Sequence, residues 1–173
     1  MVHSRPASDN EKDKRDIAIL QVLRHTGIRV GELCALRVAD IQTSERKGSL
    51  TVRSGRGSKH RVIPLNLNVR KALDDYLKVR PEVADDQLFI GQRGEGLKVR
   101  AVEDVVAKYA RLAGLEVHPH QLRHTFAKAA LDSGTDLVAV ATLLGHQRLE
   151  TTAIYTKPSP RDLEKAVERL ETR

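Results

Sequence analysis

The sequence predicts an α+β fold that is mainly α-helical, with a small antiparallel sheet on one side. Aromatic residues make up only 3% of the chain and apolar residues 40%, so the core must consist mostly of aliphatic side chains, a composition that favours helices packed on helices. Most apolar residues recur with helical spacing, whereas two short β-branched runs flank a glycine-rich turn. The 173 residues suffice for one domain with a buried core.

The first part of the chain is expected to contain two helices. Residues 1–10 are polar and are expected to form a flexible leader. Apolar residues at helical spacing predict a helix over 13–25, and Gly27 is well placed to end it. A second helix is expected over 30–37.

A change of period between residues 39 and 65 predicts a β-hairpin. Residues 49–52 and 61–65 are short and rich in β-branched side chains, and the glycine-rich segment 54–58 lies between them. The sequence also allows a further strand near 39–42. The turn has two interpretations, a solvated loop tip or a basic finger that reaches a phosphate backbone.

Helices are expected to fill the rest of the chain. Asn66 begins one, and a short buried segment follows at 88–90. In the next helix Leu112 is predicted to face inward with the valines. The helices expected after residue 90 cover 100–113, 119–133, 135–144 and 149–156, followed by a last amphipathic helix beyond a proline-rich break at 158–160.

The composition points to a polyanionic partner. The net charge is +7 and the sequence pI is about 9.8, a balance that attracts nucleic acid, with an anionic membrane surface or no specific partner as the rival interpretations. No apolar run approaches the length of a membrane span, and no signal peptide is evident. Cys34 is the only cysteine, which excludes an internal disulfide and fits a reducing cytoplasm.

Chemistry-bearing side chains gather between residues 120 and 155. On the helix that begins at Pro119, His120 and Arg123 share one arc with His124, and the apolar residues, Ala129 among them, lie on the other side. We therefore expect His120 and Arg123 to face open space, near a helix N-terminus that favours an anion.

The segment after this helix brings a histidine and a tyrosine into the same stretch. His146 ends the next helix, and Tyr155 follows nine residues later on a helix poor in large apolar anchors. That helix is expected to be a movable element, and Tyr155 is the tyrosine least typical of a core residue.

Three segments of the chain resemble the signature boxes of the tyrosine recombinases, the phage integrase family, and are close in order and spacing to those of its Xer-type members. The matching sequences are Thr26-Gly27-Ile28-Arg29-Val30-Gly31-Glu32-Leu33, His120-Gln121-Leu122-Arg123-His124, and Leu143-Leu144-Gly145-His146 followed by Ile154-Tyr155. The resemblance covers nearly all of residues 12–170 and implies site-specific recombination of double-stranded DNA.

The resemblance implies a role for each matching side chain. Arg29 and Arg123 would clamp the scissile phosphate, and Tyr155 would attack the phosphorus to give a 3′-phosphotyrosyl enzyme. His120 would act as general base towards the tyrosine, and His146 would hydrogen-bond the phosphate.

Two further residues would support these groups. Glu32 would orient the arginines from behind, and His124 would either support the site or belong to the packing. No metal or other cofactor is implied.

One position departs from the family pattern. Family members usually carry a lysine in the hairpin turn that protonates the leaving 5′-oxygen, and alignment places Arg56 there. The nearest lysine is Lys59. Because arginine gives up a proton poorly, Lys59 is the preferred acid, although the alignment favours Arg56.

The resemblance also bears on domain organisation. Residues 11–173 are expected to be the catalytic domain, without the N-terminal core-binding domain that family members usually carry. The helix at 160–173 either packs on its own domain or docks on a neighbouring protomer assembled on DNA.

Three other functions remain open from the sequence. The first is topoisomerase-like strand passage of the type IB kind, and the second is DNA binding by a relative without catalysis. The third is a metal site built from histidines at positions 118, 120, 124 and 146.

We expect Lys59→Ala to slow DNA strand cleavage far more than Arg56→Ala does, because an ammonium group can release a proton that a guanidinium retains. Single-turnover cleavage of a DNA substrate by each variant measures the effect. The opposite ordering would assign the acid role to Arg56.

Overall fold

The computed structural model describes residues 9–53, 60–146 and 150–156, so the predicted glycine-rich turn and the helix at 160–173 lie outside the described residues. The described chain is mostly helical and contains one three-stranded antiparallel sheet in the order β1-β2-β3. This is the predicted fold class. None of the helices in the described ranges is both long and apolar enough to cross a membrane.

Helix α1 (Asp9–Thr26) forms the centre of the main core. Acidic residues in its first turn and basic residues in its last turn interact favourably with the helix dipole. It begins at Asp9, four residues before the predicted start, so the end of the predicted leader is helical. Gly27 ends the helix with φ +64°, the left-handed conformation that favours glycine.

Two short elements follow α1. Helix α2 (Val30–Cys34) is shorter than predicted, and the main-chain N–H of Arg29 donates to the Glu32 carboxylate at 2.8 Å, which satisfies one terminal donor. The 3-10 helix η1 (Val38–Asp40) then leads into the sheet.

The sheet matches the predicted hairpin and adds a third strand. Strands β1 (Ile41–Thr43), β2 (Gly48–Val52) and β3 (Arg61–Pro64) pair with Leu50 opposite Ile63 and Val52 opposite Arg61. Leu50, Val52 and Ile63 are buried on the inner face. Because side chains alternate along a strand, Arg61 lies on the same buried face as Ile63.

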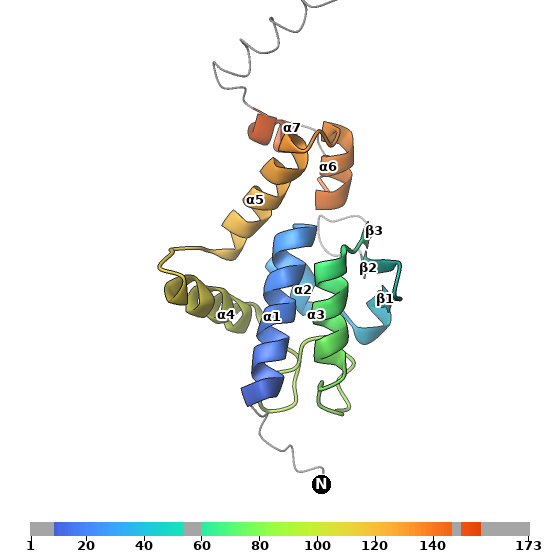
Figure 1. The fold of residues 1–173 in the computed structure, drawn as a ribbon, viewed down its shortest axis with the longest axis vertical. Helices are drawn as coiled ribbons and strands as arrows, with labels where there is room; N and C mark the ends of the chain where they lie inside the picture. Colours follow the sequence, from blue (N-terminus) through green and yellow to red (C-terminus); the bar gives the residue numbers. More distant parts are fainter. Residues whose placement is uncertain (1–8, 54–59, 147–149, 157–173) are drawn as a thin grey trace, which may run out of the picture.

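Helix α3 (Leu67–Leu77) and helix α4 (Val99–Leu112) complete the main core. The Asn66 side chain caps α3 by accepting from the Val69 N–H at 3.0 Å. Figure 1 shows α1 and α3 side by side, with α4 on the other side of α1. The prediction that Leu112 faces inward is wrong: it is 75% exposed, because it lies in the last turn, where α4 leads away towards α5.

The last helices form a second, smaller core at one end of the molecule (Figure 1). They are α5 (Pro119–Asp132), α6 (Leu137–Leu144), α7 (Glu150–Ala153) and the 3-10 helix η2 (Ile154–Thr156). Ala127, Val140 and Leu144 are its fully buried residues, with Tyr155 packed against them. Ala129, expected inside, is exposed, because α5 buries Ala127 instead.

We expect Gly27→Ala to lower the free energy of unfolding by about 2–4 kcal/mol, the sum of overpacking and left-handed strain. A Cβ there would overlap the Phe126 ring and approach Leu144 to 2.9 Å. Urea unfolding measures the effect.

Gly31→Ala is the matched control, because a Cβ at that helical position meets nothing within 4 Å. It should leave stability unchanged or slightly raised. Equal losses in the two variants would contradict this account of Gly27.

Candidate active site

Arg123 of α5 is buried between the ends of two other helices. Its side chain donates to the main-chain carbonyl of Gly27 after α1, to that of Leu144 at the end of α6 at 2.9 Å, and to His146 Nε2 at 2.9 Å. The prediction that Arg123 faces open space is wrong, since it is only 5% exposed. The cause is that carbonyl groups at helix C-termini lack helical partners and need donors.

The described partners of Arg123 carry no negative charge. They are two carbonyls and an imidazole, and no carboxylate within the described residues lies in ion-pair range of Arg123. Burial and then the positive charge of Arg29 lower the pKa of Arg123 to about 10, so it remains a cation at neutral pH. A buried guanidinium that still has free N–H groups is a site for an anion.

The Glu32 carboxylate joins Arg29 to a second arginine. It accepts from the Arg29 main-chain N–H at 2.8 Å and from Arg29 Nη1 at 3.4 Å. It also forms a two-bond ion pair with Arg61, at 3.0 and 2.8 Å. Glu32 therefore lies behind Arg29, whose side chain remains 44% exposed and can meet a ligand.

Arg61 is a site residue that the sequence interpretation missed. Its Nε donates to the Leu143 carbonyl at 2.7 Å, and its guanidinium lies so close to Gly145 that a Cβ there would come within 2.7 Å of it. The signal was present in the strand pattern, because a charged residue stands in the inward phase shared by Ile63 and Leu65.

His146 links Arg123 to the segment that carries the tyrosine. Its Nδ1 lies 2.8 Å from Thr152 Oγ1, and its Nε2 faces Arg123. A guanidinium only donates, so Nε2 accepts and the network places the ring proton on Nδ1. Burial, followed by the charges of Arg123, Arg29 and Arg61, lowers the pKa of His146 to about 4. The ring is therefore neutral at pH 7.

Tyr155 lies half-buried on η2, beside the arginine cluster formed by Arg29, Arg61 and Arg123. Its ring meets that of His124 edge to face, with centroids 4.8 Å apart and planes at 72°. It is also near enough for its charge to raise the pKa of Arg123. The segment carries few large apolar side chains, as expected from the sequence, but Thr152 within it is fully buried.

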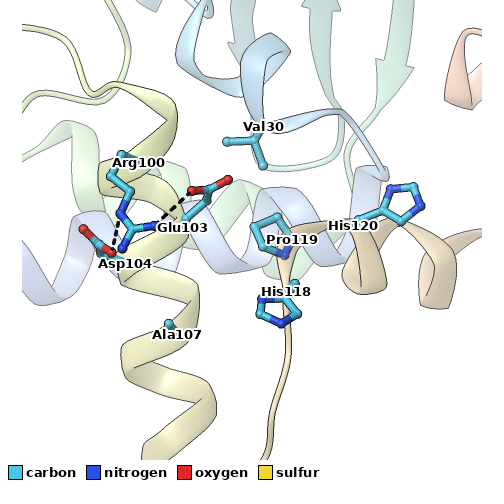
Figure 2. Close-up of a pocket in the computed structure, with 8 residues that line it drawn as sticks. All are labelled: Val30, Arg100, Glu103, Asp104, Ala107, His118, Pro119 and His120. Carbon is cyan, nitrogen blue, oxygen red and sulfur yellow. Dashed lines mark ion pairs between the residues drawn. The ribbon is translucent and has the colours of Figure 1, made fainter.

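His120 lies at the edge of a cavity. The cavity has a volume of 540 Å³ and lies between α4 and the start of α5, as Figure 2 shows; its lining residues are Val30, Arg100, Glu103, Asp104, Ala107, His118, Pro119 and His120. Val30 directly follows Arg29, so the cavity borders the arginine cluster. The His120 side chain is exposed and open to a ligand.

Two sequence candidates remain. Arg56 and Lys59 lie outside the described residues. Across the described ranges, no group of three or more His, Cys, Asp or Glu side chains could hold a metal ion. Burial raises the pKa of Cys34 to about 11, as expected for a packed thiol rather than a nucleophile.

Comparison with known proteins places this cluster in a family. The sequence profile of the phage integrase family matches residues 4–161. The chain belongs to the phage integrase family. It is 40% identical over 171 residues to tyrosine recombinase XerC of Corynebacterium glutamicum, and 43% identical over 164 residues to tyrosine recombinase XerA of Pyrococcus furiosus. These alignments cover 96% and 91% of the chain but 54% and 56% of the relatives, so the chain spans about half their length.

Solved structures of family members share the fold. A crystal structure of XerA recombinase has a TM-score of 0.79 and 32% identity, with 97% of this chain and 66% of that one covered. XerH recombinase bound to its difH substrate before cleavage has a TM-score of 0.80 and 27% identity, with coverages of 96% and 49%. The predicted fold and the resemblance to tyrosine recombinases are thus confirmed.

We expect the free energy of unfolding to fall as the pH is lowered from about 6.5 to 4, and His146→Gln to reduce that slope. The folded-state pKa of His146 is about 4 and its ordinary value is 6.5, so in this window the unfolded chain binds a proton that the folded chain excludes. Urea titrations at several pH values provide the slope. Above pH 7 both proteins should show equal slopes, and equal slopes below pH 6 would contradict the lowered pKa.

Proposed function

We propose that this chain is the strand-cleaving portion of a site-specific DNA recombinase that acts through a covalent phosphotyrosyl intermediate. The observation that carries the proposal is the buried guanidinium of Arg123, which has neutral partners and lies beside Arg29 and Tyr155. The relatives at about 40% identity are named tyrosine recombinases, and XerH is described in complexes before and after cleavage.

Arg29 and Arg123 bind the two non-bridging oxygens of the scissile phosphate in this proposal. Their side chains differ in burial, 44% exposed against 5%, so Arg123 provides the fixed arm and Arg29 the arm that closes on DNA. His146 completes the clamp as a neutral hydrogen-bonding group. Preorganised donors of this kind stabilise the charge that develops on phosphorus in the transition state.

The chemical step forms one bond and breaks another. The Tyr155 oxygen attacks phosphorus and gives its proton to His120, while the bond from phosphorus to the 5′-oxygen breaks. Lys59, or Arg56 in its place, protonates the leaving oxygen. Attack by a 5′-hydroxyl from another strand reverses these steps and completes recombination.

For this proton transfer, His120 and Tyr155 must come within hydrogen-bond distance when DNA is bound. The segment from α5 to η2 packs on a small core. DNA that fills the cavity beside Val30 would place its sugar-phosphate backbone against His120. Catalytic hydrogen bonds commonly shorten only in the bound complex.

The proposed partners follow from the same chemistry. The net charge of +7 suits double-stranded DNA, and further recombinase protomers would assemble on that DNA, with residues 160–173 as the contact. We place the chain in the cytoplasm, where a single thiol stays reduced. Residues 11–173 form the catalytic domain in this proposal.

We expect the protein to form a covalent adduct with nicked suicide DNA and Tyr155→Phe to abolish it. A pool of nicked duplexes with randomised sequence makes the test independent of the target site. Denaturing electrophoresis detects protein bound to labelled DNA. Tyr109→Phe, a change of the same kind on α4, should leave the adduct in place.

Failure of the wild-type protein to trap any duplex would leave a DNA-binding protein without catalysis. An adduct that forms with every sequence, together with relaxation of supercoiled DNA, would indicate topoisomerase-like strand passage instead.

A further inference from the structure

Thr152 is a fully buried polar residue with no role in the chemistry described so far. It lies on α7, three residues before Tyr155, with 0% of its surface exposed. Its hydroxyl oxygen lies 2.8 Å from Nδ1 of His146. A buried threonine that contacts a site histidine from the tyrosine-bearing segment calls for a functional explanation.

The hydrogen bonds around His146 require this hydroxyl to act as an acceptor in one state and as a donor in the other. In the unbound structure Nε2 accepts from Arg123, so Nδ1 carries the proton and Thr152 accepts it. A phosphate oxygen that binds the free N–H groups of Arg123 and lies beside Nε2 requires a donor, not an acceptor, at that nitrogen. Nδ1 then has no proton and needs a donor of its own.

We propose that Thr152 is a positioning residue that holds the His146 ring in either tautomer, so that the ring can change from acceptor of Arg123 to donor towards phosphate. A hydroxyl meets both demands because it accepts and donates by rotation about its C–O bond. In the exchange, Nδ1 releases one proton to solvent and Nε2 takes one up. The charge of the ring does not change.

This arrangement couples phosphate binding to the tyrosine-bearing segment. Arg123, His146 and Thr152 form one chain of hydrogen bonds that runs from α5 to α7. The phosphate-dependent rearrangement of that chain therefore acts on the segment that leads directly to Tyr155. The catalytic part of this inference rests on the proposed function, whereas the exchange of tautomers does not.

Two substitutions separate the hydroxyl from the shape of the side chain. Thr152→Val keeps the shape and loses the hydroxyl, whereas Thr152→Ser keeps the hydroxyl and loses a methyl group. Nitrogen-15 NMR of the histidine rings reports the tautomer of the full chain at pH 7, with His146→Gln to assign the signal. Wild type and Thr152→Ser should show the Nδ1-protonated ring and shift towards Nε2 protonation with inorganic phosphate.

Thr152→Val should lose that phosphate-dependent shift, and its rate of strand cleavage at saturating DNA should fall about five- to tenfold, as for one lost hydrogen bond. Its DNA affinity should stay within about twofold, and Thr152→Ser should recover most of the rate.

A Thr152→Val protein with the wild-type tautomer response, or a Thr152→Ser protein without it, overturns the proposal, as does a wild-type ring that ignores phosphate. The NMR measurement needs no cleavage. A protein that exchanges tautomers but forms no covalent adduct would refute the recombinase function alone.

Discussion

The buried ion pair between Glu32 and Arg61 is the interaction on which the site depends. It joins α2 to β3, and the bond from Arg61 to the Leu143 carbonyl ties both to the end of α6. Such a pair adds little net stability, because desolvation offsets the attraction, but removal of one partner costs about 3–5 kcal/mol. Its main consequence is geometric: the carboxylate is fixed where it receives the main chain and side chain of Arg29.

The same pair explains why the site favours an anion. Three guanidinium groups, from Arg29, Arg61 and Arg123, lie near one carboxylate that Arg61 already engages through both oxygens. Burial, reinforced by the excess positive charge, lowers the pKa of His146 and keeps the ring neutral, and the acceptors of Arg123 are neutral too. A phosphate diester supplies one negative charge with two oxygens in a geometry that forked donors match. Binding of such a phosphate would therefore relieve a charge imbalance that folding creates.

The sequence predicted elements better than it predicted their contacts. Local patterns sufficed for the hairpin and for the helix capped by Asn66, since both depend on near neighbours. Helical spacing predicted which side chains share a face of α5, but it did not predict which other elements cover that face. Arg123 is buried because the ends of α1 and α6, distant in sequence, bring their carbonyls to it. Arg61 stood in an inward strand position, a signal that could have been used.

The division of the molecule into two cores gives the two halves of the site different rigidity. Arg29, Glu32 and Arg61 belong to elements that surround the large core. Among the residues that the structure describes, Tyr155 packs on a cluster with three fully buried apolar residues, of which two are alanine and valine. Local opening costs least where few apolar contacts are lost. In the proposed reaction, Arg123 is fixed by the Gly27 and Leu144 carbonyls and Arg29 belongs to the large core, so the phosphate can be held before the lightly packed tyrosine takes its final position. The order of events in the proposed cleavage then follows from packing, and the bond from Arg61 to the Leu143 carbonyl links the large core to the small one.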